Sequence, residues 1–267
     1  MAVSPSPRVR SLPHARESRK GVYLLPNLLT SAGLFCGVYS IVQTMQGEYL
    51  FAALAILVAQ LFDILDGRVA RYTNTASRFG VEYDSLCDLV SFGVASGLLI
   101  YGWALKPWGV WGWLAIGLFV ICAALRLARF NTMVDKVDGS FSGLPVPAAA
   151  MMLASVVLMY KYLGRSGLPD KHIALLLMTY TLAALMVSTL PFASFKQLRL
   201  NRRQPLWRLV LAILMLKFLI ARYELVIFLF ISAYVCSGPI TWALKRYRGE
   251  PIAVLTVEEE DEEDLEA

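Results

Sequence analysis

Histidine, cysteine and charge are all scarce in this sequence. Only two histidines, His14 and His172, and four cysteines occur among its 267 residues, with no CxxC pair and no Cys/His cluster. This spacing argues against structural zinc and against a disulfide framework. Charged residues make up 17% of the chain and hydrophobic residues 57%, which is more apolar surface than a soluble core in so small a chain can use.

Long apolar runs take the place of charge. The mean hydropathy is +0.58, and runs of about 20 residues, the length that crosses a bilayer as a helix, recur along most of the chain. The sequence therefore predicts an all-α fold, a polytopic membrane helix bundle of about eight transmembrane helices. The expected spans are residues 22–44, 48–70, 82–104, 109–129, 146–163, 172–191, 205–220 and 223–243.

The basic residues predict the orientation of the bundle. With the amino terminus in the cytoplasm, 19 of the 25 lysines and arginines fall in cytoplasmic segments, which favours both termini inside. The seventh span is short and contains Lys217, but without it the basic end of the eighth would lie outside. We expect an integral protein of the inner (cytoplasmic) membrane, with a basic cytoplasmic arm (1–20), a membrane catalytic domain (21–245) and an acidic, disordered tail (246–267).

Four aspartates lie close together in the segment DILDGRVARYTNTASRFGVEYDSLCD. They are Asp63, Asp66, Asp84 and Asp88. A carboxylate at bilayer depth costs about 2.5–3.5 kcal/mol on insertion scales, so four near one membrane boundary need a stabilising partner. Hard divalent cations take carboxylate oxygens and often hold substrate phosphates at the same time. The cluster therefore predicts a metal site facing the cytoplasm, and an enzyme rather than an inert bundle.

The spacing places these carboxylates on two neighbouring helices. Asp63 and Asp66 are three residues apart near the end of the second helix, and Asp84 and Asp88 are four apart in the first turns of the third. Each pair therefore shares a helix face. Because the connection between the helices is short, we expect them to be antiparallel neighbours whose carboxylate pairs converge.

Small residues and one arginine flank the carboxylates, at Gly67, Ala70, Gly80 and Arg71. The small residues allow a planar base or a second backbone to approach, and a guanidinium pairs well with phosphate oxygens. Such a pocket suits a pyrophosphate bridged by divalent ions, with a remaining carboxylate as general base. A plain ion-pair network with Arg68 and Arg71 would explain one aspartate pair but not the combined pattern.

The pattern D-x2-D-G-x2-A-R-x8-G-x3-D-x3-D matches in full at Asp63, Asp66, Gly67, Ala70, Arg71, Gly80, Asp84 and Asp88. It resembles the defining motif of the CDP-alcohol phosphotransferases, membrane enzymes that displace CMP from a CDP-linked alcohol with the hydroxyl of a second alcohol. The resemblance implies a six-helix family core with helices seven and eight added, and a homodimer.

The resemblance also implies residue roles. Asp63, Asp66 and Asp84 would bind Mg²⁺ or Mn²⁺, and Asp88 would deprotonate the acceptor, also touching a second metal ion. The three small residues of the motif would border the cytidine, and Arg71 would contact phosphate.

Two further strings indicate the acceptor. LLPNLLTSAGLFCGVYSI, which offers Asn27 and Thr30 to the nucleotide and diphosphate at the membrane boundary, and RLARFNTM followed by FSGLPVPAAA resemble the membrane-embedded bacterial and archaeal phosphatidylserine synthases. This implies CDP-diacylglycerol as donor and L-serine as acceptor. Cationic and amide donors suit the serine carboxylate, and the candidates are Arg126, Arg129, Asn131 and Ser142. The two arginines would otherwise be membrane-interface anchors.

Other functions remain as alternatives. The same chemistry on glycerol 3-phosphate or inositol phosphate would require a more basic acceptor pocket. An intramembrane prenyltransferase would carry two acidic motifs far apart in the sequence, and a transporter would carry acidic residues deep in several helices. The expected partners are the two substrates, the lipid bilayer and a second copy of the chain, with no nucleic acid.

Overall fold

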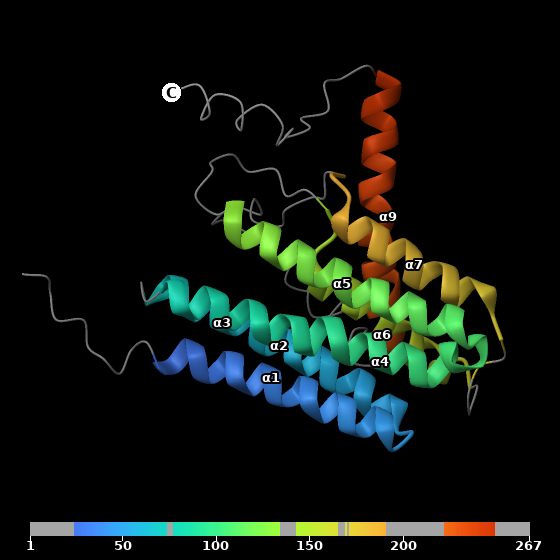
Figure 1. The fold of residues 1–267 in the computed structure, drawn as a ribbon, viewed down its shortest axis with the longest axis horizontal. Coiled ribbons are helices and arrows are strands. Elements are labelled where there is room, and N and C mark those ends of the chain that lie inside the picture. The colour runs from blue at the N-terminus through green and yellow to red at the C-terminus, as the bar shows by residue number, and fades with distance from the viewer. Residues whose placement is uncertain are drawn as a thin grey trace, which may run out of the picture.

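The chain folds into a bundle of helices (Figure 1). A computed structural model describes residues 24–73, 77–133, 143–164, 169, 171–190 and 222–248, and every regular element within them is helical. The elements are α1 (Leu24–Met45), α2 (Tyr49–Tyr72), α3 (Arg78–Asp88), η1 (Leu89–Val94), α4 (Ala95–Ile100), η2 (Tyr101–Leu105), η3 (Lys106–Trp108), α5 (Val110–Met133), α6 (Val146–Tyr162), α7 (Ile173–Val187) and α9 (Tyr223–Arg248).

The described helices confirm the all-α prediction and refine the spans. Five are long and apolar enough to cross a membrane: Leu25–Met45, Tyr49–Tyr72, Arg78–Trp108, Val110–Thr132 and Tyr223–Leu244. The predicted spans at 146–163 and 172–191 correspond to the shorter apolar helices α6 and α7. The predicted span at 205–220, the arm at 1–20 and most of the tail at 246–267 lie outside the described residues.

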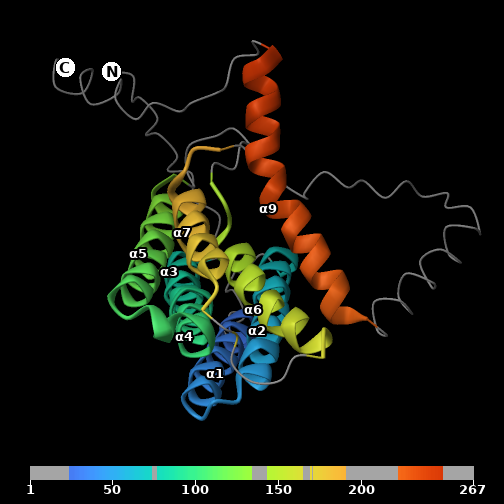
Figure 2. The ribbon, with the colours of Figure 1, turned by 90° about the vertical axis from the view of Figure 1, so that its right-hand side faces the viewer.

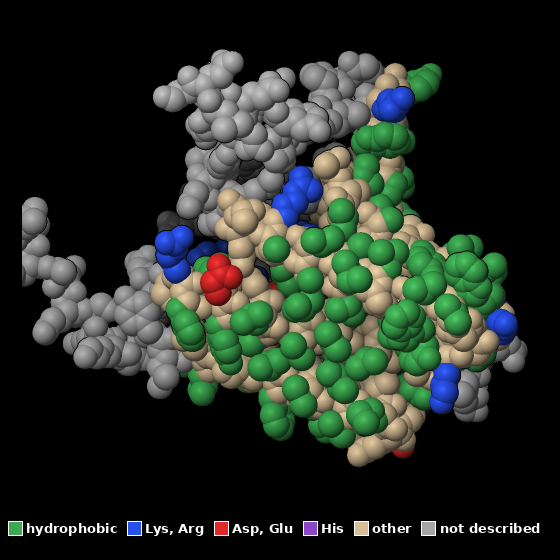
Figure 3. All heavy atoms as spheres, in the orientation of Figure 1, with side chains coloured by type: hydrophobic (Ala, Val, Ile, Leu, Met, Phe, Trp, Pro, Cys, Tyr) green, Lys and Arg blue, Asp and Glu red, His purple; other side chains and the backbone are tan. Residues whose placement is uncertain are grey.

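Apolar side chains cover the visible face of the bundle. Figure 3 shows hydrophobic side chains spread over the helices, with the Lys, Arg, Asp and Glu side chains towards the margins of this face. That distribution suits contact with lipid along the helices and with water at their ends. Together with the five apolar spans, it indicates an integral membrane protein.

A tight turn makes α1 and α2 an antiparallel pair. Gly47 adopts a left-handed backbone with φ +81°, a conformation open to glycine that ends many helices. Its N–H donates to the Thr44 carbonyl oxygen at 3.1 Å. Along the pair, a Cβ added at Gly33 would lie 3.6 Å from the Ala59 carbonyl oxygen. Small residues therefore let the two backbones approach closely, as in other membrane helix pairs.

The third span begins earlier than the sequence predicts. Ser77 is its N-cap, and the Ser77 hydroxyl oxygen accepts a hydrogen bond from the Gly80 N–H at 3.0 Å. The helix thus starts at Arg78 rather than at residue 82, because this cap satisfies one of its free N–H groups. Asp84 and Asp88 consequently lie in the second and third turns, not in the first turns as expected.

Directly after Asp88 the helix widens into the π-helical turn η1. A π turn holds one extra residue per turn, so it shifts the faces of the residues that follow it. On this turn, the Ser91 hydroxyl donates to the Gly33 carbonyl oxygen of α1 at 3.4 Å. Ser91 also leaves no room for a Cβ at Gly37. The turn therefore lies directly against α1.

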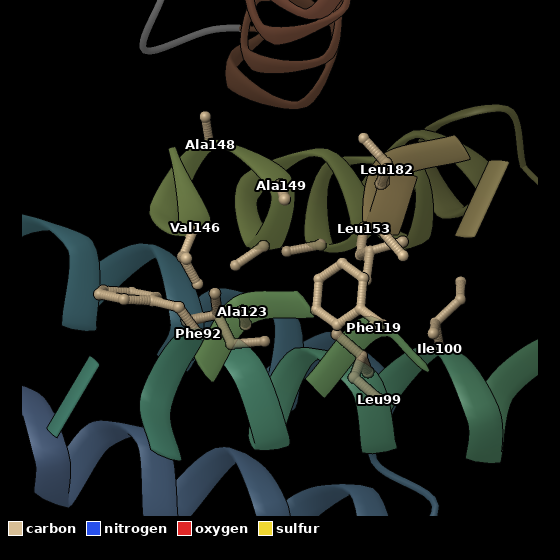
Figure 4. Packing of buried hydrophobic residues seen from close by; sticks show 14 of the residues in the cluster. Phe92, Leu99, Ile100, Phe119, Ala123, Val146, Ala148, Ala149, Leu153 and Leu182 are labelled. Carbon is tan, nitrogen blue, oxygen red and sulfur yellow. The ribbon is translucent and has the colours of Figure 1, made fainter. Parts of the chain in front are cut away.

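The core lies where α4, α5 and α6 meet. Figure 4 shows Phe119 of α5 between Leu99 of α4 and Leu153 of α6, all fully buried. On α6, a run of alanines at Ala148, Ala149 and Ala150 is buried as well. These small and apolar side chains let α6 pack closely against α2 and α4.

The last helix, α9, runs across the bundle rather than along it. Both views show it crossing the direction of α1 to α5 (Figures 1 and 2). It packs against α6, where Ile231 is buried and the Ser232 hydroxyl lies 3.6 Å from the Met152 sulfur. Most of its apolar surface stays exposed, and it extends to Arg248, past the predicted start of the tail at residue 246.

Candidate active site

The two helices that carry the acidic pattern bring their carboxylates together. Asp63 and Asp66 of α2 and Asp84 of α3 each offer one oxygen, and these oxygens all lie within 4.8 Å of one another. Asp88, one turn beyond Asp84, lies outside this group of three but lines the same pocket. The structure therefore places all four aspartates around one space, between antiparallel neighbours as expected.

The pocket is small and lies between α1, α2 and the third span. It has room for little more than one ion or water-sized group, and its lining residues are Thr30, Gly33, Leu34, Ala59, Asp63, Asp66, Asp84, Cys87, Asp88, Ser91 and Phe92. This space thus suits ions and phosphate oxygens, while the rest of a nucleotide or lipid would extend outside it.

Neighbouring polar groups orient two of the carboxylates. The Gln60 amide donates to Asp63 Oδ2 at 3.0 Å. The Thr30 hydroxyl lies 2.8 Å from Asp66 Oδ2 and 3.1 Å from the Pro26 carbonyl oxygen, so its single proton serves one acceptor at a time. Asp66 itself is only 4% exposed. Supporting contacts of this kind commonly fix the orientation of metal-binding side chains.

The donor set fits a hard divalent cation. Like charges within 4.8 Å repel, and Asp84 Oδ1 is buried without a hydrogen-bond partner in the described part of the chain. Within those residues, neither Asp63 nor Asp66 pairs with Arg68 or Arg71, so the plain ion-pair network is not what the structure contains. Oxygen ligands from carboxylates are those that Mg²⁺ and Mn²⁺ prefer. These residues can therefore hold a metal ion.

The flanking residues leave open space beside the carboxylates. In the part of the chain that the structure describes, a Cβ added at Gly67 would meet no atom beyond the backbone of α2 itself within 4 Å, whereas one at Gly80 would lie 3.6 Å from Asn27 Oδ1 of α1. Ala70 is half-buried on the next turn of α2. The exposed Arg71 donates through Nε to the Gly67 carbonyl oxygen at 2.9 Å. Gly67 thus borders a free surface, and Gly80 and Asn27 lie side by side.

One predicted acceptor residue, Asn131, is engaged within the protein. Its Oδ1 accepts from the Ser85 hydroxyl at 3.1 Å, and its Nδ2 donates to Glu82 Oε2 at 3.1 Å. The amide therefore joins α5 to α3. On the other side of α3, the hydroxyls of Tyr83 and Ser31 share a hydrogen bond of 2.8 Å. The helix that carries Asp84 and Asp88 is thus tied to both of its neighbours.

The other predicted acceptor residues are placed unequally. Arg126 is half-buried on α5, where its charge interacts with that of Asp88. Arg129 is half-buried one turn further along, and Ser142 lies outside the described residues. The residue after it, Gly143, has φ +85° and packs against the carbonyl oxygens that end α7. The backbone N–H groups of Gly143 and Leu144 donate to the carbonyl oxygens of Leu190 and Leu185, so the start of α6 is held against the end of α7.

Sequence reasoning missed three of the residues that the structure places here. Gln60 lies three residues before Asp63 on the same helix face, so its spacing was a usable signal. Ser85 lies next to Asp84 and contacts Asn131 only through helix packing. Tyr234 of α9 interacts electrostatically with Arg126, and no local pattern connects these two distant residues.

Within the described residues, an apolar helix bundle whose carboxylates converge in one pocket defines a candidate membrane enzyme that uses a divalent metal ion. Comparison identifies the family: the sequence profile described as CDP-alcohol phosphatidyltransferase matches residues 23–192, and this chain belongs to that family. The match covers α1 to α7 and ends before α9. The family depends on divalent metal ions.

Three relatives with assigned names are similar to this chain. The chain is 39% identical to a CDP-diacylglycerol–serine O-phosphatidyltransferase of Helicobacter pylori over 223 residues, which is 83% of this chain and 92% of the relative. It is 35% identical to the enzyme of that name from Bacillus subtilis over 173 residues, 65% of this chain and 92% of the relative. An archaetidylserine synthase of Methanothermobacter thermautotrophicus is 40% identical over 136 residues, 50% and 58% of the two chains.

Proposed function

We propose that this protein transfers the phosphatidyl group from CDP-diacylglycerol to L-serine, forming phosphatidylserine and releasing CMP. The observation that carries this proposal is that three aspartate oxygens lie within 4.8 Å of one another. Relatives that are similar over most of this chain bear the name of that serine transferase. The archaeal relative, named for archaetidylserine, also has serine in its product.

The chain's own residues account for the chemistry. Asp63, Asp66 and Asp84 would hold one or two Mg²⁺ or Mn²⁺ ions, with Asp88 touching the second. The metal, when bound, neutralises the diphosphate and makes its phosphorus more electrophilic. Asp88 takes the proton of the serine hydroxyl, whose oxygen forms a bond to the lipid-side phosphorus. The bond from that phosphorus to the CMP oxygen breaks, and CMP leaves with the electron pair.

The nucleotide and diphosphate lie along α1, α2 and α3 in this proposal. The residues that contact them are Asn27, Thr30, Asp63, Asp66, Gly67, Ala70, Arg71 and Gly80. Two observations support the assignment. Among the described residues, no atom outside the backbone of α2 itself lies within 4 Å of a Cβ built at Gly67, and Asn27 meets Gly80 on α3. Arg71 lies one turn beyond Asp66, where its guanidinium stabilises charge on the departing CMP phosphate.

Serine binding is assigned to the neighbouring side of the pocket. The candidates are Arg126, Arg129, Asn131 and Ser142, of which Arg126 interacts with Asp88 and Asn131 bonds to α3. The second candidate function is the same transfer to glycerol 3-phosphate or inositol phosphate. The names of the relatives favour serine.

The membrane arrangement completes the proposal. The proposed protein has eight membrane spans, with an arm at 1–20, a membrane domain at 21–245 and an acidic tail at 246–267. Both termini and the active site face the cytoplasm. The protein acts as a homodimer. Five apolar spans and two shorter apolar helices support the count in part. Labelling single cysteines from each side of sealed vesicles tests the sidedness, and crosslinking in the membrane tests the dimer.

Purified protein with CDP-diacylglycerol, radiolabelled L-serine and Mg²⁺ or Mn²⁺ tests the activity. We expect metal-dependent label in phosphatidylserine and serine-dependent release of CMP, both abolished by Asp88→Asn. A panel with glycerol 3-phosphate and inositol phosphate separates the two candidate functions. Absence of serine-dependent CMP release, or undiminished release by Asp88→Asn, contradicts the proposal.

A further inference from the structure

The wall of the carboxylate pocket carries a serine hydroxyl that is not part of the acidic pattern. Ser91 lies three residues beyond Asp88, where the pattern ends, and lines the pocket together with Asp84 and Asp88. Its side chain is only 2% exposed. A buried polar group costs free energy unless hydrogen bonds compensate for its lost contact with water. The place of this hydroxyl beside the carboxylates therefore needs a physical reason.

The protein itself holds the Ser91 hydroxyl only weakly. In the described part of the chain its acceptor is the Gly33 carbonyl oxygen of α1, at 3.4 Å, whereas hydroxyl hydrogen bonds usually measure about 2.5–3.0 Å. A serine in a helix commonly donates to the carbonyl oxygen four residues earlier. Ser96, in the same span, does so with the Phe92 carbonyl oxygen, but Ser91 does not. Its proton is thus free to serve a ligand.

The π turn and its packing fix Ser91 at the pocket wall. The turn η1 (Leu89–Val94) begins directly after Asp88, and π turns inside α-helices are frequent at functional sites. Phe92, the residue after Ser91, is buried in the hydrophobic core (Figure 4). On the side of α1, a Cβ at Gly37 would clash with Ser91. Core packing and a close glycine therefore hold this side chain in place.

The other groups of the pocket wall indicate which ligand Ser91 serves. Four aspartates line the pocket, and ionised carboxylates accept hydrogen bonds or bind metal but donate none. The other hydroxyl of the wall, that of Thr30, gives its proton to Asp66 or to the Pro26 carbonyl oxygen, and the Cys87 thiol is a weak donor. A phosphate oxygen that reaches this space therefore finds its uncommitted hydroxyl donor in Ser91.

We infer that Ser91 is a further catalytic residue, whose hydroxyl donates a hydrogen bond to a non-bridging oxygen of the transferred phosphoryl group. In phosphoryl transfer, charge is spread over these oxygens in the transition state, and a donor fixed in advance stabilises it there. The proton stays on Ser91, so the bonds that form and break are those of the proposed reaction. The inference rests on the proposed function, but the same contact would serve any acceptor alcohol.

The Ser91→Ala variant tests the inference, because it removes the hydroxyl and leaves the carboxylates in place. Loss of one donor to developing negative charge typically lowers kcat about 100- to 1,000-fold, and we expect a fall in that range for CMP release. The KM for serine and the Mn²⁺ concentration for half-maximal activity should stay within about threefold, since the hydroxyl binds neither acceptor nor metal. Ser91→Cys keeps the volume but donates weakly, so its kcat should lie between the two.

The matched control is Ser96→Ala. Ser96 is fully buried in the same span and donates within its own helix, so this variant should keep kcat within about twofold. Calorimetric titration with Mn²⁺ and thermal unfolding should give the same values for Ser91→Ala as for the wild type. Lower thermal stability with an unchanged kcat would make Ser91 a structural link to α1. A raised serine KM would assign it to the acceptor, and weaker Mn²⁺ binding to the metal site. Each of these three results overturns the inference.

The wild-type reaction keeps this result distinct from the proposed function. A wild-type protein that releases no CMP with any acceptor of the panel contradicts the proposed function, and the inference with it. An active wild-type protein, with Ser91→Ala indistinguishable from it, contradicts only the role of Ser91.

Discussion

The two sides of the candidate site are built in different ways. The α2 and α3 side draws all four aspartates from one short stretch of sequence, and a brief connection between two helices brings them together. On the α5 and α9 side, Arg126 lies within electrostatic range of Tyr234, a residue distant in sequence on a helix that packs against α6. The comparison teaches that the carboxylate cluster is encoded locally here, whereas the surroundings of Arg126 depend on tertiary packing.

The largest expected effect comes from removing one carboxylate from the aspartate cluster on α2 and α3. Asp84→Asn removes one charge from the three-oxygen group while keeping nearly the same volume, so we expect a folded protein with a weakened metal site. Serine-dependent CMP release should fall by at least about a thousandfold, since metal charge stabilisation is worth several kcal/mol. Calorimetric titration with Mn²⁺ should show weaker binding.

The control for this prediction is another carboxylate on the same helix pair. Glu48→Gln alters an exposed residue just before α2, at the end opposite Asp63 and Asp66, and should keep full activity. Activity of Asp84→Asn within tenfold of the wild type would contradict a metal role for this residue.

The next effect concerns the groups that orient the carboxylates. Thr30→Val keeps the shape of the side chain and removes the hydroxyl that lies 2.8 Å from Asp66 Oδ2. Loss of such a supporting contact typically costs about 10- to 100-fold in metal affinity, so the metal concentration for half-maximal activity should rise by that factor. Thr179→Val, which removes a buried hydroxyl bonded within α7, is the matched control. Equal metal dependence in both variants would mean that Thr30 does not orient Asp66.

A smaller effect tests the open surface beside the carboxylates. A methyl group at Gly67 meets no described residue within 4 Å apart from the backbone of its own helix, so Gly67→Ala should fold as the wild type does. If the nucleotide lies there, KM for CDP-diacylglycerol should rise about tenfold, since a substrate contact worth roughly 1.4 kcal/mol changes affinity by that factor. Gly117→Ala on α5 also adds a methyl group to open space and should change nothing. Equal kinetics for the two variants would contradict a nucleotide contact at Gly67.

Sequence alone predicted the local side of the site well. The i, i+3 and i, i+4 spacing and a short connection sufficed to predict two facing carboxylate pairs. It misplaced the start of α3, because the Ser77 cap lies ahead of the apolar run. It could not predict the π turn after Asp88, the crossing direction of α9 (Figure 1) or the electrostatic proximity of Tyr234 to Arg126. These depend on which helices pack together, and apolar helices in a membrane carry little pattern that selects one neighbour over another.

The smallest expected effect decides whether Asn131 links α5 to α3 or binds serine. Sequence reasoning assigned its amide to serine, whereas the structure uses that amide to join Ser85 and Glu82 of α3 to α5. If it acts as this link, Asn131→Ala loses two hydrogen bonds, each worth about 1 kcal/mol. Thermal stability should then drop modestly, while serine KM stays within about twofold. Any fall in kcat would come from displacement of α3, which carries Asp84 and Asp88.

A serine ligand at Asn131 would give the opposite result. Serine KM would rise several-fold with unchanged thermal stability, because a group that binds substrate contributes little to the free protein. The double variant Asn131→Ala with Ser85→Ala sharpens the distinction. For a helix-to-helix link, the stability losses of the two single variants are not additive, since both remove the same hydrogen bond. Additive stability losses together with a raised serine KM would instead assign Asn131 to serine binding.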